Sequence, residues 1–213
     1  MGTPESTLHP IYTVGHSNLE LAELAGALRK FSVDLLADVR SLPRSMRHPQ
    51  FSRDNLEEGL RDAGLRYLFL GDELGGRPAD PKLYASNGLV DYRARRACRD
   101  FQSGIERVMD EARRAPLALL CAEEDPLTCH RFLMITPELT LRGIAPLHIR
   151  KGGTLESQAE AEDRLLATHE MAAFAGASLF PADRASALED ALAVQAEKCA
   201  FRADPQALEY SQY

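Results

Sequence analysis

The fold of this chain is decided by residues 117–131, which read LALLCAEEDPLTCHR. The apolar run 117–120 ends in Cys121, and three acidic residues and a proline follow. A second cysteine then opens the turn Cys129-His130-Arg131, after which a new apolar-periodic segment begins. This order predicts a buried strand, a short loop and the start of a helix. It gathers thiols, carboxylates, an imidazole and a guanidinium where an α/β sheet normally binds its ligand.

The composition is that of an ordinary globular protein. Of the 213 residues, 45% are hydrophobic and 27% are charged, and a domain takes about 100–200 residues. The net charge of −7 is unevenly distributed, because residues 1–153 carry 21 basic and 21 acidic side chains whereas residues 154–213 carry 4 and 11. The C-terminal segment is therefore a poor surface for nucleic acid or for an anionic membrane.

The cysteine content and the hydropathy indicate the compartment. Four cysteines in a chain of this length do not make a disulfide scaffold. No stretch approaches the roughly 20 apolar residues of a membrane span, and residues 1–9 lack the apolar run of a signal peptide. We expect a cytoplasmic protein with reduced thiols and no membrane partner.

Five apolar or β-branched runs are expected to be strands, with a helix between successive strands. The expected strands are 11–14, 33–39, 65–70, 117–122 and 144–149. This alternation predicts an α/β fold, a mainly parallel five-stranded Rossmann-like sheet with helices on both faces. We expect the strand order 3-2-1-4-5, with the last strand at an edge because it contains Pro146.

Capping signals give the expected helix starts. Ser17 lies three residues before Glu20, which is a capping-box spacing, and an apolar helical face follows. One long helix is expected over residues 91–114, and another is expected to start at Thr128, with this threonine as its N-cap.

The chain is expected to divide in two. Residues 11–150 would form the α/β domain, and residues 151–213 an acidic helical C-terminal extension. The extension is expected to hold helices over residues 160–175 and 185–200.

Polar and titratable residues follow the expected strands. Ligands bind beyond the carboxyl ends of parallel strands, so we expect these residues to share one edge of the sheet. They are His16, Ser17, Asp38, Arg40, Arg44, Ser45, Gly75, Gly76, Cys121, Glu123, Cys129, His130 and Arg131. In particular, we expect His16 and the turn Cys129-His130-Arg131 to share a single pocket.

Four of these motifs, in this order, resemble the domain-of-unknown-function family four-eight-eight. They are Gly15-His16-Ser17, Asp38-Val39-Arg40 with Pro43 and Ser45, Leu70-Gly71 with Leu74-Gly75-Gly76, and Cys121 through Cys129-His130-Arg131. The resemblance covers about residues 11–150 and implies a fold and a motif set, but no reaction.

A reactive thiol is the first chemistry that these residues suggest. A helix N-terminus and the neighbouring histidine and arginine would stabilise a thiolate at Cys129. Cys121, at the end of a buried strand, is a second catalytic candidate, although either thiol could simply pack as a small apolar group. His16 and Glu123 could transfer protons.

Anion binding is the second chemistry. Arg40, Arg44, Arg47 and His48 cluster in one loop, and Arg131 is expected at a helix N-terminus, an arrangement that suits phosphate. Ser17, Asp38, Ser45, the two glycines Gly75-Gly76 and His130 complete the expected binding set. No glycine-rich dinucleotide or NTP-binding motif is present.

The sequence therefore predicts an enzyme that acts on a small phosphate- or nucleotide-containing substrate with a thiol, histidine and arginine site. One alternative is a non-catalytic module that binds a nucleotide or nucleic acid. Another is a metal-dependent hydrolase or transferase, because His16, Cys121, Cys129 and His130 are ligands that zinc accepts. No local pair has zinc-finger spacing, so no metal ligand is assigned, and cofactor and oligomeric state are left unspecified.

Overall fold

The computed structural model of the chain describes residues 8–176 and 181–204. Its elements are β1 (Ile11–Gly15), α1 (Leu21–Lys30), β2 (Leu35–Asp38), η1 (Pro49–Phe51), α2 (Arg53–Asp62), β3 (Arg66–Phe69), α3 (Gly71–Leu74), η2 (Pro81–Leu83), α4 (Tyr92–Arg96), α5 (Arg99–Ala112), β4 (Leu117–Cys121), η3 (Pro126–Thr128), η4 (Arg131–Ile135), α6 (Thr136–Leu141), β5 (Leu147–Arg150), β6 (Thr154–Ser157), α7 (Gln158–Thr168), η5 (Ala172–Phe174) and α8 (Pro181–Cys199). Most η elements are short 3₁₀ turns, and η4 is a π-helical turn. No helix in these residues is long and apolar enough to cross a membrane.

The strands of the described residues form one mostly parallel, six-stranded sheet in the order β3-β2-β4-β1-β5-β6. β6 is the antiparallel member and pairs with β5 at the edge. The α/β class and the mainly parallel sheet are confirmed, but the expected five strands and the order 3-2-1-4-5 are wrong. β4 lies between β2 and β1. β5 is an interior strand, paired with β1 and β6, and Pro146 lies just before its first residue, so the proline removes no hydrogen bond from the sheet.

Burial explains the central place of β4. All five of its residues are buried, and a strand that is covered on both faces has a continuous apolar sequence. β3 has the opposite character, because Arg66 is exposed and the rest of the strand is only half-buried. It accordingly forms one edge of the sheet.

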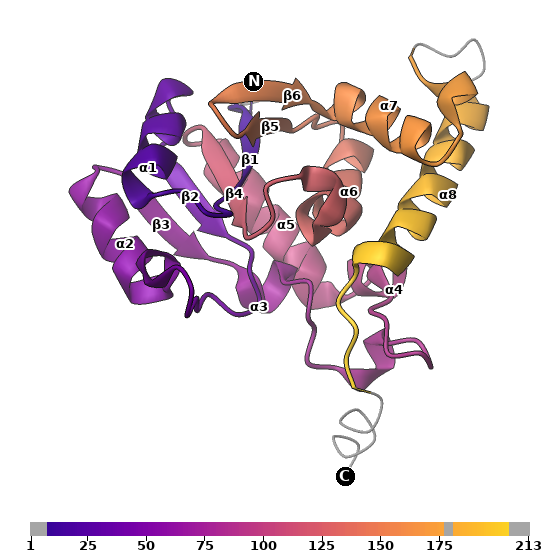
Figure 1. The fold of residues 1–213 in the computed structure, drawn as a ribbon, viewed down its shortest axis with the longest axis horizontal. Helices are drawn as coiled ribbons and strands as arrows, with labels where there is room; N and C mark the ends of the chain where they lie inside the picture. The colour runs from indigo at the N-terminus through magenta and orange to yellow at the C-terminus, as the bar shows by residue number, and fades with distance from the viewer. Residues whose placement is uncertain (1–7, 177–180, 205–213) are drawn as a thin grey trace, which may run out of the picture.

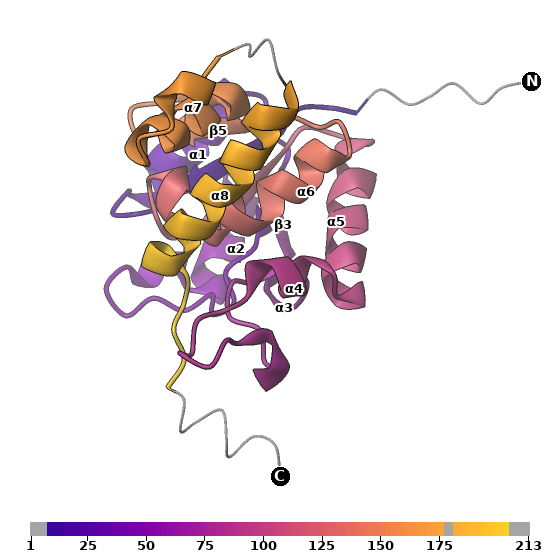
Figure 2. The ribbon, with the colours of Figure 1, turned by 90° about the vertical axis from the view of Figure 1, so that its right-hand side faces the viewer.

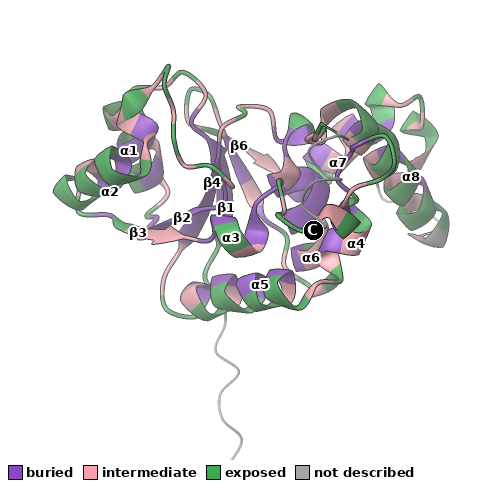
Figure 3. Ribbon diagram, turned by 90° about the horizontal axis from the view of Figure 1, so that it is seen from below, coloured by how far each residue is buried: buried purple, intermediate pink, exposed green. Residues whose placement is uncertain are grey.

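Helices cover both faces of the sheet (Figure 1). On one face α1 and α2 pack against Leu120, and on the other α5 and α6 pack against Leu119. Successive strand residues point to opposite faces, so neighbouring residues of β4 enter different cores. Figure 3 shows the buried strands between helices whose outer sides are exposed.

The described residues after 153 pack on the rest of the chain, and their first element, β6, is a strand of the sheet itself. α7 and α8 contact each other (Figure 2), and Ala161, Leu165 and Ala191 belong to the same core as Leu119. The two helices expected here are present with shifted bounds, α7 over Gln158–Thr168 and α8 over Pro181–Cys199.

Three expected helix boundaries are wrong. Glu20 caps α1 through a capping box with Glu23, whereas Ser17 lies outside the helix with a φ of 42°. The long helix expected over 91–114 is interrupted at Cys98, which is the N-cap of α5. Thr128 is not an N-cap but the last residue of the 3₁₀ turn η3, which Asp125 caps by accepting a hydrogen bond from the Leu127 amide.

Candidate functional site

Four side chains at and just beyond the end of β4 form a group that we call the thiol–imidazole cluster: Cys121, Glu123, Cys129 and His130. His130 Nδ1 lies 3.5 Å from Cys121 Sγ and 3.8 Å from Cys129 Sγ. The Glu123 carboxyl oxygen Oε2 lies 3.1 Å from Cys121 Sγ. Both sulfurs are buried, with the two cysteines 3% and 2% exposed. The structure thus brings together four of the residues predicted from the sequence.

The His130 ring is fixed from two sides. Its Nε2 donates to the carbonyl oxygen of Val39 at 2.9 Å. Since a carbonyl oxygen only accepts, Nε2 carries a proton and Nδ1 faces the sulfurs. Gly76 lies against the ring, and a Cβ atom there would come within 2.8 Å of it. Strand β2 and the loop after α3 therefore position the imidazole.

The loop 122–125 is held by buried contacts. Arg131 is fully buried and donates to the carbonyl oxygens of Glu123 and Glu124 at 2.5 and 2.7 Å. Gly15 lies directly beneath, because a Cβ atom there would come within 1.6 Å of the Glu123 carbonyl oxygen. These contacts fix the backbone that carries the Glu123 carboxyl group.

The C-terminal part of the chain holds the same loop from outside. Arg150, on β5, donates to both oxygens of Glu124 at 3.0 Å. Arg164, on α7, donates to both oxygens of Asp125 at 2.9 and 2.8 Å. Strand β5 and helix α7 thereby contribute to the order of the loop that carries Glu123, a role that neither arginine revealed in the sequence.

The charge of the cluster is centred on Cys121. Burial alone would raise the pKa of its thiol. The hydrogen bond from Cys129 and the positive charges of His130 and Arg131 outweigh burial and hold the pKa well below its usual range. Burial and the Cys121 sulfur raise the pKa of Cys129 well above its usual range. No α-helix begins at Cys129, so the helix N-terminus that was expected to stabilise a thiolate there is not formed.

The charge of Cys121 also shifts the pKa values of His130 and Glu123. Although burial opposes it, the Cys121 sulfur raises the pKa of His130. Glu123 is exposed as a residue, but its carboxyl group lies against the sulfur, where desolvation and the Cys121 charge raise its pKa. Burial, and to a smaller extent the charges of Cys129 and Cys121, also raise the pKa of Tyr92 at the start of α4. Its position after a long loop gave no sign of this in the sequence.

A second group of polar residues lies at the ends of β1 and β2. Asp38 accepts two hydrogen bonds from the Arg40 guanidinium, at 2.8 and 2.6 Å, and one from Tyr67 at 3.0 Å. Arg40 Nη1 donates to His16 Nε2 at 3.2 Å, and the His16 ring stacks on Phe51. Burial and the charge of Arg40 lower the pKa of His16 to about 4, so this imidazole is neutral.

The two groups are neighbours at one sheet edge. The His16 amide donates to the Cys121 carbonyl oxygen at 3.0 Å. Their side chains nevertheless have separate surroundings, because His16 stacks on Phe51 beneath α1 and α2 while Cys121 contacts His130. The two predicted groups therefore share one edge of the sheet, and the charge of Cys121 acts on His16 by raising its pKa, which burial and Arg40 lower.

The arginines of the predicted anion site differ in availability. Arg40 and Arg131 are 6% and 0% exposed and already bind partners within the protein. Arg44 is exposed. Ser45 Oγ accepts from the His48 amide and shapes the loop. Gly75 is buried, and a Cβ atom there would come within 2.3 Å of the Gly71 carbonyl oxygen, so it serves close packing.

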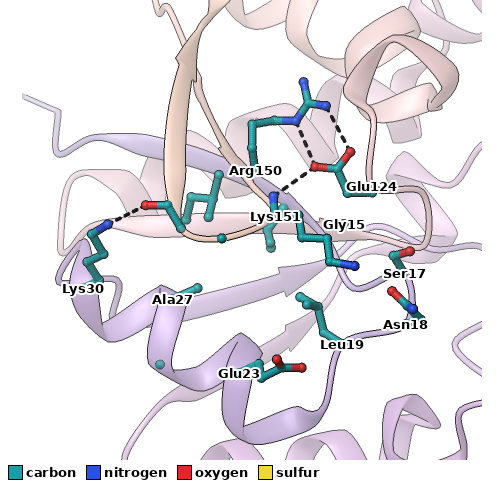
Figure 4. Close-up of a pocket in the computed structure, with 15 residues that line it drawn as sticks. Gly15, Ser17, Asn18, Leu19, Glu23, Ala27, Lys30, Glu124, Arg150 and Lys151 are labelled. Atoms are coloured by element: carbon teal, nitrogen blue, oxygen red, sulfur yellow. Dashed lines mark hydrogen bonds and ion pairs between the residues drawn. The ribbon is translucent and has the colours of Figure 1, made fainter.

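A pocket of about 410 Å³ opens beside the end of β1 (Figure 4). Its lining includes Gly15, Ser17 and Glu124, and the side chain of Lys151 reaches across it in Figure 4. Lys30 closes one side by donating to the Gly153 carbonyl oxygen at 2.5 Å. Gly15 is paired with Cys121 in the sheet, so this pocket starts one strand spacing, about 5 Å, from the cluster backbone.

Fold and cluster together define an α/β protein with buried thiols and an imidazole beyond the carboxyl end of a central parallel strand. The family model of the domain of unknown function DUF488 matches residues 20–136, and the chain belongs to this family. The resemblance seen in the sequence is thereby confirmed.

Two further comparisons add little. No curated protein matches the chain. A crystal structure from Shewanella putrefaciens CN-32, of a DUF442 protein provisionally named a phosphatase, aligns over 90% of this chain and 89% of its own. Its identity is 13% and its TM-score 0.36. This similarity is too low to support an argument about fold or activity.

Proposed function

We propose that this protein is an enzyme that acts on a small phosphate-containing substrate, with Cys121 and His130 as its reaction centre. The observation that carries the proposal is the fixed imidazole. His130 is held by the Val39 carbonyl with Nδ1 3.5 Å from Cys121 Sγ. A sulfur and a base in contact, with the base oriented by a third group, is the arrangement of an activated nucleophile.

The reaction class that this arrangement suits is group transfer. The Cys121 sulfur would attack an electrophilic atom of the substrate, and the bond to the leaving group would break. His130, protonated on Nδ1, would give its proton to the leaving group. Water, deprotonated by the same imidazole, would then release the group from sulfur and regenerate the thiolate.

The substrate class has separate support. Arg44 and Arg47 are exposed at the same sheet edge, and no carboxylate among the described residues pairs with either. Lys151 reaches into the 410 Å³ pocket that starts beside Gly15. Arg44 and Arg47 lie in the loop after β2 and do not line the pocket, so Lys151 is the one of these three cations that would meet an anionic ligand there.

Labelling and ligand binding test the proposal together. As the pH is lowered, iodoacetamide labelling of Cys121 should fall off less steeply than labelling of Cys98, because the pKa of the Cys121 thiol is low, and the Cys121→Ser variant should lose this label in mass spectra. Some member of a panel of nucleotides and sugar phosphates should raise the melting temperature. The Lys151→Ala variant should lose that stabilisation, whereas Lys82→Ala, an exposed lysine outside the pocket, should keep it. Unreactive Cys121 together with no stabilising ligand would refute the proposal.

The alternative of a nucleic-acid-binding module makes a different prediction. It requires an affinity for DNA or RNA that falls steeply with salt and is lost in the Arg44→Ala/Arg47→Ala variant. The net charge of −7 opposes this, so we expect no such binding.

A further inference from the structure

The same cluster has the geometry of a metal site. Among the described residues, Cys121 Sγ, Cys129 Sγ and His130 form a set of possible ligand atoms that lie within 4.8 Å of one another. We propose that these three side chains bind one zinc-class divalent ion, with the fourth position open beside Glu123. This inference goes beyond the proposed function and has only the residues Cys121 and His130 in common with it.

The distances support tetrahedral coordination. Zinc binds sulfur at about 2.3 Å and imidazole nitrogen at about 2.0–2.1 Å, so a tetrahedral ion separates the two donor atoms by about 3.6 Å. The separations from His130 Nδ1 are 3.5 Å to Cys121 Sγ and 3.8 Å to Cys129 Sγ. Both sulfur–nitrogen separations therefore match those of ligands of one ion, and the two sulfurs lie within 4.8 Å of each other.

The groups around the ligands are those that metal sites use. A metal-bound histidine almost always donates its other ring N–H to a carbonyl or carboxylate, and His130 Nε2 donates to Val39 at 2.9 Å. The Arg131 amide donates to Cys129 Sγ at 3.5 Å. Such a contact suits a sulfur that carries negative charge.

The ligand types select the ion. Two thiolates and an imidazole suit zinc and related soft ions, whereas magnesium and calcium take oxygen ligands. Three protein ligands leave one position for water or substrate, which is the pattern of catalytic rather than structural zinc sites. Glu123, with Oε2 3.1 Å from Cys121 Sγ, flanks that position, where its carboxylate could accept a proton from bound water.

Binding of the ion and attack by sulfur exclude each other, because both use the same lone pair of Cys121. The loaded cluster would act through its open position, and the metal-free cluster through sulfur. Zinc should therefore protect Cys121 from iodoacetamide, which separates the two proposals experimentally.

The test uses the full chain without a metal-affinity tag, stripped with a chelator and titrated with Co²⁺. We expect one equivalent to bind, with the thiolate-to-cobalt absorption and strong visible bands of a tetrahedral sulfur site, and zinc should displace it. Mg²⁺ should neither bind there nor compete. Loss of a residue that only hydrogen-bonds a metal ligand typically weakens metal binding 10–100-fold. We expect a larger loss of Co²⁺ affinity from each of the ligand substitutions Cys121→Ser, Cys129→Ser and His130→Gln.

Cys98→Ser is the matched control, because this half-buried thiol contacts the Ala94 carbonyl and lies outside the cluster. It should bind Co²⁺ as the wild type does, and circular dichroism should confirm that all variants are folded. Absence of a one-to-one sulfur–cobalt spectrum in the folded wild type would overturn the metal site. So would unchanged binding after loss of either cluster cysteine. Rapid labelling of Cys121 in the same metal-free sample would still support the nucleophile, so the two proposals fail separately.

Discussion

Gly76 packs so closely against the His130 ring that a larger residue at position 76 would collide with it: a Cβ atom there would lie 2.8 Å from the imidazole ring. The Gly76→Ala variant should therefore displace the ring from Cys121 and Val39. We expect slower labelling of Cys121, weaker Co²⁺ binding and a lower free energy of unfolding in urea.

The matched control is Gly26→Ala in α1, where nothing lies within 4 Å of the added carbon. Replacing a helical glycine by alanine stabilises by roughly 0.5–1 kcal/mol. This variant should therefore unfold at a higher urea concentration and label normally. A Gly76→Ala protein that labels like the wild type would contradict the positioning role of the glycine.

The sequence predicted the α/β class and the edge of the sheet that carries the polar residues. This was possible because continuous apolar runs such as 117–120 are typical of strands buried on both faces. The strand order could not be read in the same way. β2 and β4 are paired over Leu35–Asp38, and which buried strand takes the central position depends on packing between distant segments.

The choice of thiol shows a second limit of sequence reasoning. The spacing around Thr128 suggested a helix start, which would have activated Cys129. The structure instead has a 3₁₀ turn, capped by Asp125, and then a π-helical turn. The groups that contact Cys121 come from elsewhere in the chain, above all the His130 ring, which the Val39 backbone holds in place, and a backbone carbonyl leaves no signal in the sequence.

Acid should destabilise the protein through its buried histidines. His148 is fully buried, with Nδ1 2.8 Å from Thr13 Oγ1 and Nε2 3.1 Å from Gln158 Oε1. Burial and the charge of Arg131 lower its pKa to about 4, against about 6.5 in an unfolded chain. The unfolded state therefore binds the extra proton between these values, so stability is full above pH 6.5 and decreases as the pH falls to 4.

The His148→Gln variant tests this dependence. Glutamine can keep a hydrogen bond to Thr13 or Gln158 but does not titrate, so the loss of stability between pH 6.5 and 4 should shrink by up to about 3 kcal/mol. Urea unfolding across this pH range measures the slope. If variant and wild type lose stability in parallel, His148 is not a source of acid sensitivity.

The Asp38–Arg40 pair should be important for stability. Asp38 is fully buried, and Arg40 is 6% exposed. Asp38→Asn removes the charge that compensates a buried guanidinium, and breaking such a pair costs about 3–5 kcal/mol. Glu58→Gln, in the exposed pair with Arg61, should change the free energy of unfolding by less than about 1 kcal/mol. Similar effects of the two substitutions would show that the buried pair has no special role.

A substitution of Arg131 tests whether this arginine has a structural role or binds an anionic ligand. It is fully buried, donates to the carbonyl oxygens of Glu123 and Glu124, and its Nε has no partner. Lysine keeps the charge but cannot make both contacts. Arg131→Lys should therefore destabilise the protein by about 2–4 kcal/mol and loosen the loop that carries Glu123. Urea unfolding gives the stability, and inorganic phosphate should shift the melting temperatures of variant and wild type equally. An unchanged stability, with loss of a phosphate response seen in the wild type, would instead make Arg131 an anion-binding residue.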